Sequence, residues 1–278
     1  IHYVGLSRVT TIEGLHITNL CESKIAVNPD VQTEMKRLRS SGCLKLSVLP
    51  LYAANPIAFK ICYLNTRSLH KHIDDIRKDL NYSSADISIF SETRFINSDH
   101  DSMYTIDGYD LFRNDSQSFN ETTRPFGGTA IYSRIKFIPN HPYNFNKNGV
   151  EITVMRCMDL PHVTIIGVYR SPKVPVRQLC AALTQVLSHS TTSYNVFIGD
   201  FNINWLNETD RFSLYNLLIT EHNYRQLVSC YTTDSRTSID HVYTNLPQSQ
   251  TQLHVLETYF SDHKSICVLI NCFNTEMG

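Results

Sequence analysis

Short runs of apolar residues, separated by polar turns, recur along the chain from Phe59 onward. Runs of about four to eight such residues, rich in branched and aromatic side chains, are typical of buried strands. Apolar residues at helical spacing instead predict helices over residues 69–80, 177–187 and 211–220. Because strands outnumber helices, the pattern predicts an α/β fold of two packed sheets flanked by helices. The predicted strands are residues 59–64, 87–90, 109–113, 128–133, 150–157, 163–169, 195–198, 241–244, 253–259 and 266–270.

The first 47 residues have a different pattern and too few apolar side chains for a core of their own. Residues 1–20 have the pattern of strand, turn and strand, and a helix is predicted over 28–40, with Asn28 as N-cap and Pro29 at the first helical position. We therefore divide the chain into a small piece (1–47), a linker (48–58) and a main domain (59–272). Because the chain opens on Ile1 rather than Met, we expect it to be a fragment of a longer polypeptide.

The composition is that of a folded domain without strong overall charge. Apolar residues make up 42% of the 278 positions, whereas charged residues make up 18%, which argues against disorder. With 25 basic and 26 acidic side chains, the formal net charge is −1, so no overall positive field attracts a nucleic acid. Any contact with DNA must therefore come from a local basic patch or from a metal ion that neutralises the phosphate.

The eight cysteines have neither zinc-binding nor disulfide spacing. No C-x-x-C pair occurs, so we expect reduced and mostly buried thiols. No signal peptide is recognisable, and no apolar run approaches the ~18 residues that span a membrane. We therefore expect an intracellular protein that is neither secreted nor bound to a membrane. The N-x-[ST] sequences at Asn81, Asn114, Asn120 and Asn207 are then interpreted as polar loops.

Strong polar residues gather where the predicted strands end. One carboxylate after a strand is more often a turn residue than a functional one. Five such strand ends are harder to explain as turns, because rigid strands aim the residues that follow them at a common site. The residues are Asn65, Glu92, Tyr169, Asp200 and Asn202 after strands, and Asp262 and His263 before the last strand.

Hydrolysis of a phosphodiester needs a metal ion and an activated water. A hard divalent cation prefers carboxylate oxygens, which Glu92 and Asp262 can supply as metal ligands. An attacking water needs orientation and removal of a proton, and the carboxylate of Asp200 suits that task.

The same reaction needs groups that hold the phosphate. Amide and phenol donors such as Asn65, Asn202 and Tyr169 can hold phosphoryl oxygens. A histidine paired with a carboxylate, here His263 with Asp240, can bind or protonate the scissile phosphate.

With these residues in place, the chain resembles the endonuclease/exonuclease/phosphatase superfamily and, within it, the endonuclease domain of LINE-type retrotransposons. Each motif is common by itself, but the set runs in the family's order between Phe59 and Cys272. The segments that carry the resemblance are Leu64-Asn65-Thr66-Arg67-Ser68-Leu69, Ser91-Glu92-Thr93, residues 108–113, residues 127–132, Val168-Tyr169-Arg170-Ser171-Pro172, Gly199-Asp200-Phe201-Asn202, Ser238-Ile239-Asp240-His241 and Ser261-Asp262-His263.

The resemblance implies a four-layer α/β/β/α sandwich of two mixed sheets, a Mg²⁺ or Mn²⁺ site, and a nick in DNA that leaves a 3′-hydroxyl. From the DNA substrate we expect residence in the nucleus. We also expect the domain to act as a monomer. The implied roles agree with the chemistry above: Glu92 as metal ligand, Asp200 at the water, Asn65 and Asn202 on the phosphate beside Tyr169, Asp240 paired with His263, and Asp262 completing the acidic cluster.

Two departures from the retrotransposon pattern concern the grip on DNA rather than the catalytic groups. Arg94 stands two residues after Glu92, where those enzymes usually have Trp. The turn Arg124-Pro125-Phe126-Gly127-Gly128 replaces one that usually has basic residues and three glycines.

The N-terminal piece resembles the last motif of Pif-type DNA helicases through Tyr3-Val4-Gly5-Leu6-Ser7-Arg8-Val9-Thr10 and Gly14-Leu15. Arg8 would correspond to an arginine that reaches the γ-phosphate of ATP; the plainer interpretation is an edge strand with a surface Arg. No G-x-x-x-x-G-K-[ST] loop occurs in the chain, so we expect no autonomous ATPase. A helicase tail joined to this endonuclease resembles the protein of Helitron-like transposons, whose helicase or transposase portion would be a partner.

Two other functions remain open from the sequence. The same fold hydrolyses other phosphate esters, such as inositol phosphates, sphingomyelin or poly(A), and the Gly-Asp-x-Asn and Ser-Asp-His segments do not separate these from DNA. An inactive DNA-binding relic of a mobile element is the non-enzymatic alternative, although all expected catalytic residues are present.

Overall fold

The structure, a computed structural model, describes residues 29, 33, 55–96, 98–116 and 126–271. The chain divides into units Ile1–Leu49 and Pro50–Gly278, and the fold below is that of the second unit. The helicase-like segment with Arg8 and most of the helix predicted over 28–40 lie outside the described residues, so those expectations stay predictions.

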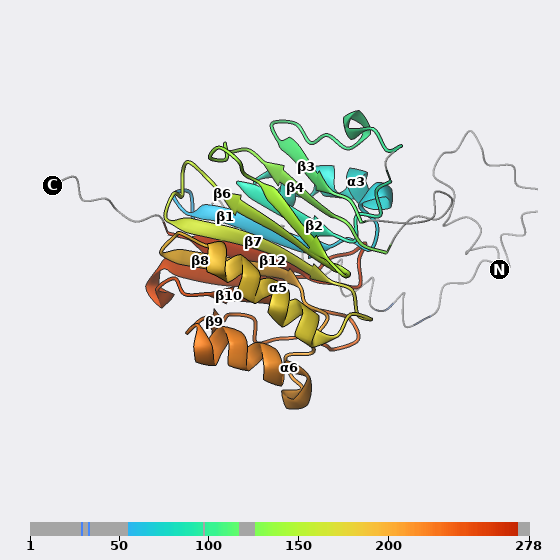
Figure 1. Cartoon of the computed structure of the whole chain (residues 1–278). Coiled ribbons are helices and arrows are strands. Elements are labelled where there is room, and N and C mark those ends of the chain that lie inside the picture. Colours follow the sequence, from blue (N-terminus) through green and yellow to red (C-terminus); the bar gives the residue numbers. More distant parts are fainter. Residues whose placement is uncertain (1–28, 30–32, 34–54, 97, 117–125, 272–278) are drawn as a thin grey trace, which may run out of the picture. The chain divides into compact units, whose positions relative to one another are not determined.

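Two six-stranded mixed sheets form the centre of the fold (Figure 1). In each sheet one central pair of strands is parallel, and a helical connection joins the members of that pair. The first sheet has the order β11-β12-β1-β2-β4-β3, with β1 Phe59–Asn65, β2 Ile87–Ser91, β3 Asp110–Asn114, β4 Thr129–Ser133, β11 Thr251–Leu256 and β12 Ser265–Ile270. The second has the order β5-β6-β7-β8-β10-β9, with β5 Tyr143–Lys147, β6 Val150–Arg156, β7 Val163–Arg170, β8 Tyr194–Asp200, β9 Arg225–Gln226 and β10 Asp240–Thr244.

The central strands are apolar on both faces because both faces are covered. In β1, Ile61 and Tyr63 face the other sheet, whereas Cys62 and Leu64 belong to a second core on the opposite face. That second core packs on α3 (Leu69–Lys78), and α4 (Leu80–Ser83) follows it in the chain. A third core lies between the second sheet and the helices α5 (Val176–His189) and α6 (Glu208–Tyr215).

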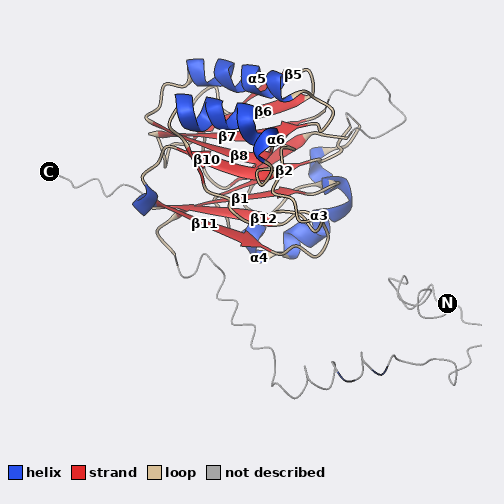
Figure 2. Cartoon of the chain, turned by 90° about the horizontal axis from the view of Figure 1, so that it is seen from below, coloured by secondary structure: helices blue, strands red, loops and turns tan. Residues whose placement is uncertain are grey.

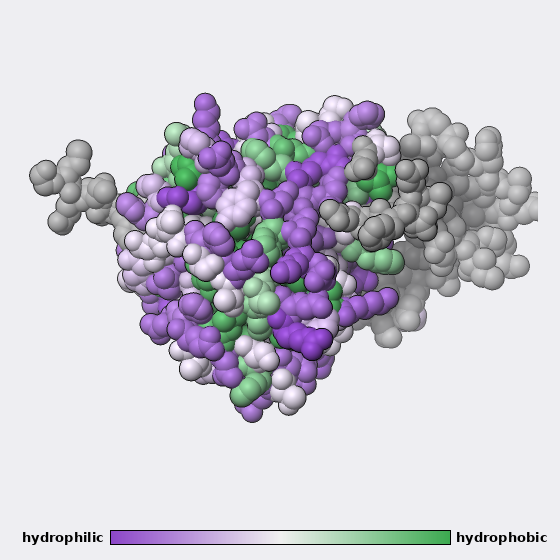
Figure 3. Space-filling view, in the orientation of Figure 1, coloured by the Kyte–Doolittle hydropathy of each residue, from purple (hydrophilic) through white to green (hydrophobic). Residues whose placement is uncertain are grey.

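Figure 2 shows the resulting layers, with α5 and α6 outside one sheet and α3 and α4 outside the other. The predicted four-layer α/β/β/α sandwich is therefore confirmed. On the face drawn in Figure 3, hydrophilic side chains surround smaller hydrophobic areas, as expected where most large apolar residues are inside the three cores.

The predicted elements differ from the observed ones in several places. The helix predicted over 211–220 begins earlier, as α6, and continues as a π-helix over Asn216–Glu221, and the two-residue strand β9 was not predicted. Asn81 and Asn114, which were interpreted as loop residues, lie in α4 and at the end of β3.

The strand β5 was not predicted, because it is an edge strand whose residues are mostly exposed and therefore lack an apolar pattern. The helix predicted over 69–80 ends at Lys78, since Asp79 is extended and caps α4 by accepting a hydrogen bond from the backbone N–H of Asn81. The strand predicted over 253–259 runs instead from Thr251 to Leu256, in register with β12.

The described cysteines are free thiols, as predicted: Cys62, Cys157, Cys180, Cys230 and Cys267. Three of them are buried, and burial raises the pKa of the Cys157 thiol to about 12, which keeps it unreactive. Among the described residues no helix is long and apolar enough to cross a membrane.

Candidate active site

A row of polar side chains crosses the second sheet at one end of the core between the sheets. Glu151, Tyr169, Asp200 and Asp240 are in register on the neighbouring strands β6, β7, β8 and β10. Residues in register point to the same face of a sheet. That face is the inner one, because Ile165 of β7 belongs to the inter-sheet core and lies on the same side of its strand as Tyr169. All four side chains are buried.

The first sheet faces this row with Asn65, the last residue of β1. Its Nδ2 donates to Asp200 Oδ2 at 2.9 Å and to Glu92 Oε1 at 3.1 Å. One buried amide therefore ties the end of β1 to the carboxylates that follow β2 and end β8. Asn65, Glu92 and Asp200, which lie far apart in the sequence, are brought together as predicted.

His263 and Asp240 form the other half of the site. His263 Nδ1 lies 2.9 Å from Asp240 Oδ2, and both side chains are buried. The loop that carries His263 is fixed to β1, because Ser261 Oγ donates to the carbonyl of Asn65 and accepts from the N–H of His263. In the described part of the chain, Asp200, Asp240 and His263 are the three potential ligands whose atoms all lie within 4.8 Å of one another.

The electrostatics of the site favour a protonated histidine beside carboxylates. Burial by itself lowers the pKa of His263, but the charge of Asp240 and its hydrogen bond outweigh burial and raise that pKa to about 9. Burial and the negative charge of Asp240 raise the pKa of Asp200. The positive charge of His263 lowers this pKa and so offsets part of the increase. A carboxylate whose pKa is raised is a better acceptor of a proton from water.

This arrangement predicts an alkaline limb in the pH profile of kcat/KM. If protonated His263 is the active form, activity falls as the pH rises through about 9. Asp240→Asn removes the charge that raises the pKa of His263, so the limb should move to lower pH. Steady-state rates between pH 6 and pH 10 measure this; identical limbs in both proteins would contradict the role of Asp240.

Four non-glycine residues near the site have left-handed backbone conformations, which L-residues seldom adopt. They follow the ends of β1, β2 and β8, and such strain often accompanies functional sites. Their φ angles are 56° at Arg67, 51° at Glu92, 56° at Arg94 and 51° at Asn202. At the same end of β8, position 199 requires a glycine for lack of space. A Cβ there would lie 1.8 Å from the carbonyl oxygen of Val168.

Asp262 is placed differently from Glu92. Its side chain is half exposed, and its Oδ1 lies 3.5 Å from Nε of Arg67. Glu92 is buried and approaches Asn65 instead. Glu92 and Asp262 were both expected to be metal ligands, but no interaction among the described residues joins their carboxylates. Their shared role therefore stays a prediction.

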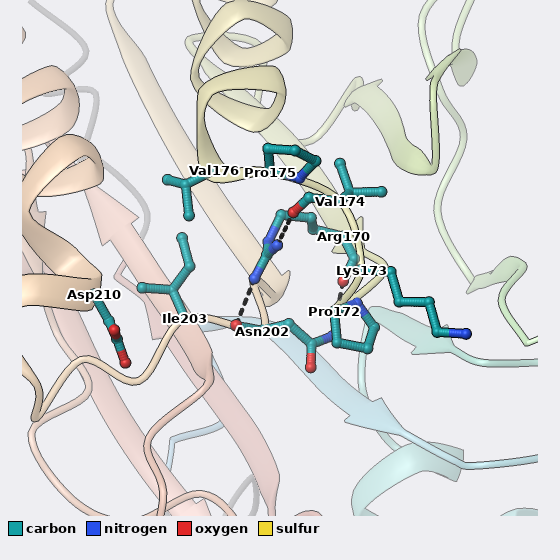
Figure 4. A pocket seen from close by; sticks show the side chains of 9 residues that line it. All are labelled: Arg170, Pro172, Lys173, Val174, Pro175, Val176, Asn202, Ile203 and Asp210. Carbon is teal, nitrogen blue, oxygen red and sulfur yellow. Dashed lines mark hydrogen bonds between the residues drawn. The ribbon is translucent and has the colours of Figure 1, made fainter.

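Asn202 and Arg170 are joined by hydrogen bonds in both directions. No role was predicted for Arg170 from the sequence. The buried guanidinium of Arg170 donates to the carbonyls of Phe201 (2.6 Å), Asn202 (2.5 Å) and Val174. In return, Nδ2 of Asn202 donates to the carbonyl of Arg170 at 2.7 Å. Figure 4 shows these hydrogen bonds beside a pocket of about 380 Å³, and the side chain of Lys173, one of the lining residues, extends away from Arg170. The only signal in the sequence was the position of Arg170 next to Tyr169.

Glu151 is a second residue that the sequence analysis missed. It accepts the N–H of Gly128 at 2.9 Å, and burial raises its pKa from 4.5 to about 7. Since it lies beside Tyr169 in the row, it anchors the turn at Gly127 and Gly128 to the site. Alternation along β6 could have placed it on the inner face, but a Glu there fits neither a core position nor a known motif.

The raised pKa of Glu151 has a consequence for stability. A folded-state pKa above the unfolded value means that the folded protein loses stability as the pH rises from about 4.5 to about 7. Glu151→Gln does not titrate, so relative to the wild type it should gain about 1–3 kcal/mol between pH 4 and pH 8. Denaturant unfolding of both proteins at the two pH values measures this difference; an unchanged difference would show that Glu151 is not buried as an acid.

The sequence profile of the endonuclease/exonuclease/phosphatase family matches residues 62–263, which is more than half of the chain. The chain belongs to this family. Its members are hydrolases that act on phosphodiester bonds, and the matched segment includes every predicted site residue from Asn65 to His263. No curated protein sequence matches the chain.

Several solved structures share the fold of this family member. The endonuclease domain of TRAS1, a telomere-specific non-LTR retrotransposon, is 14% identical, with 77% of this chain and 98% of that domain covered and a TM-score of 0.58. An AP endonuclease from Archaeoglobus fulgidus is 15% identical (77% and 100% covered, TM-score 0.57). The 3′ phosphatase NExo from Neisseria, bound to a product DNA hairpin, is 18% identical (77% and 99% covered, TM-score 0.57). At these identities the likeness shows the fold.

The donor set of this family member fits a hard divalent cation. Glu92, Asp200 and Asp240 offer carboxylate oxygens, and Asn65 links two of these groups. Such oxygens are the preferred ligands of small divalent ions, and Nδ1 of His263 is paired with Asp240.

Proposed function

We propose that this protein is a DNA endonuclease that hydrolyses one phosphodiester bond and leaves a 3′-hydroxyl. The observation that carries the proposal is the convergence of Asn65, Asp200, Asp240 and His263 at one end of the inter-sheet core. The retrotransposon motifs of the sequence favour DNA over other phosphate esters. Residence in the nucleus follows from that substrate. A role in transposon mobility, which the resemblance implies, and action as a monomer belong to the same proposal.

In the proposed reaction the residues of this chain divide the work. Asp200 orients the attacking water and accepts its proton, because its buried carboxylate has a raised pKa. Protonated His263, held by Asp240, stabilises the negative charge that develops on the phosphate. Asn202, which gives one amide hydrogen to the carbonyl of Arg170, donates its other hydrogen to a phosphoryl oxygen, with the hydroxyl of Tyr169 beside it. Asn65 gives its two amide hydrogens to Asp200 and Glu92, so it holds the phosphate by exchanging one of these acceptors for a phosphoryl oxygen.

The proposed cofactor is Mg²⁺ or Mn²⁺. Bound at Glu92, with Asp262 completing the acidic cluster, it would neutralise charge on the scissile phosphate. Asp262 would then have to exchange its contact with Arg67 for the ion.

A comparison of substrates tests the proposal. The purified protein should nick plasmid DNA with Mg²⁺, and a DNA polymerase should extend the nicks without prior treatment, because they carry 3′-hydroxyls. It should release little product from an inositol phosphate, sphingomyelin or poly(A) at the same enzyme concentration. Faster turnover of one of those compounds would assign the site to another branch of the family, and inertness on all of them would support the relic.

A further inference from the structure

An aromatic ring stands exposed at the edge of the site, on a backbone that is fixed to it. Phe126 exposes 77% of its surface, yet its carbonyl accepts a hydrogen bond from the hydroxyl of Tyr169 at 3.4 Å. The next two carbonyls, of Gly127 and Gly128, accept the N–H groups of Arg94 and Thr93 at 3.0 Å and 3.1 Å. The ring is therefore exposed although the turn that carries it is tied to the active site.

The two glycines of this turn make the close attachment possible. A Cβ at Gly127 would lie 2.8 Å from Oε1 of Glu151, and one at Gly128 would lie 2.5 Å from Oγ1 of Thr93. Gly128 also has a φ of 87°, which favours glycine. A side chain at Gly128 would be strained by this backbone conformation, and one at either position would displace a side chain that the turn now contacts.

Arg94 joins the ring to the catalytic carboxylates. Its guanidinium carbon lies 4.9 Å from the centre of the Phe126 ring, and its Nη2 lies 3.7 Å from Oε2 of Glu92. Arg67, half exposed, is a second guanidinium near the strand ends. Each of these arginines lies near a carboxylate, Arg94 near Glu92 and Arg67 near Asp262, and each guanidinium has several N–H donors that can also contact a phosphate.

We propose that Phe126 and Arg94 form a stacking platform that binds an unpaired base next to the scissile phosphate. Phe126 stacks on the face of that base, and Arg94 contacts the neighbouring phosphate. In an intact duplex both faces of each base are covered by its neighbours, so a ring can stack only where the strand is single or distorted. The preferred substrate is therefore DNA that is unpaired at the cleavage site. The inference rests on the proposed function and specifies its substrate.

The test uses short oligonucleotides that contain several 2-aminopurines, whose fluorescence falls when they stack. Binding of the full chain is measured in EDTA, so that no cleavage occurs, with single-stranded and fully paired versions of one sequence. The variants are Phe126→Ala, Phe126→Trp and, as a matched control, Phe212→Ala, which removes an exposed ring on α6.

The wild type should bind the single strand roughly tenfold more tightly than the duplex, with quenching of fluorescence. Phe126→Ala should lose both effects, whereas Phe126→Trp and Phe212→Ala should keep them. Equal affinity for the two forms in the wild type, or wild-type binding by Phe126→Ala, would overturn the platform. If the same preparation still nicks plasmid with Mg²⁺, the proposed endonuclease stands and only the platform fails; if it neither binds nor nicks DNA, both fail.

Discussion

Asp200→Asn is expected to lower kcat for DNA nicking by about 10³-fold. The variant keeps the shape of the side chain but cannot accept a proton from water. It gives up one of the two hydrogen bonds that Asp200 accepts, but it also removes one of two buried acidic groups that lie close together, and the two effects on stability oppose each other. We expect the melting temperature to stay within a few degrees of that of the wild type.

Asp110→Asn is the matched control, because Asp110 is an exposed aspartate on β3 of the other sheet. It should nick DNA at the wild-type rate. Single-turnover rates and thermal unfolding of the three proteins decide the matter. A folded Asp200→Asn protein with undiminished activity would remove Asp200 from the chemical step.

His263→Gln is expected to lower kcat by about 10²-fold. Glutamine can still donate a hydrogen bond to Asp240 but carries no positive charge for the phosphate. Because a buried carboxylate then loses its cation, this variant should also be less stable than the wild type.

A readout besides rate separates catalysis from stability for His263. The alkaline limb near pH 9 should disappear in His263→Gln, which a merely less stable protein would not show. His222→Gln, an exposed histidine after α6, serves as the control and should keep both rate and limb. If His263→Gln retains the limb, another group is responsible for it.

Much of the fold could be predicted from alternation and periodicity. Strands such as β1, β7 and β12 are continuous apolar runs because both of their faces are covered, and this pattern indicated two packed sheets. The edge strand β5 was missed because its exposed residues have no such pattern. The break after Lys78 was missed because Leu80 matches the helical spacing although it is more than half exposed.

The candidate site could be predicted only for residues whose type and position at a strand end indicate a catalytic role. Asp240 with His263, and Asn65 with Asp200, were expected to converge, and the structure brings each pair within hydrogen-bonding distance. Arg170 was overlooked because its task is to hold carbonyls, which any sequence contains. Glu151 was overlooked because only strand register across the sheet shows that it neighbours Tyr169.

The central claim is that this site hydrolyses DNA with the help of a divalent cation. Its most direct test is the conversion of supercoiled plasmid to the open circular form by the full chain, with Mg²⁺ and then with EDTA. We predict nicking with Mg²⁺, none with EDTA, and recovery when Mg²⁺ is returned in excess. Plasmid that stays supercoiled with Mg²⁺ or Mn²⁺ at high protein concentration would contradict the account, and so would nicking that persists in EDTA.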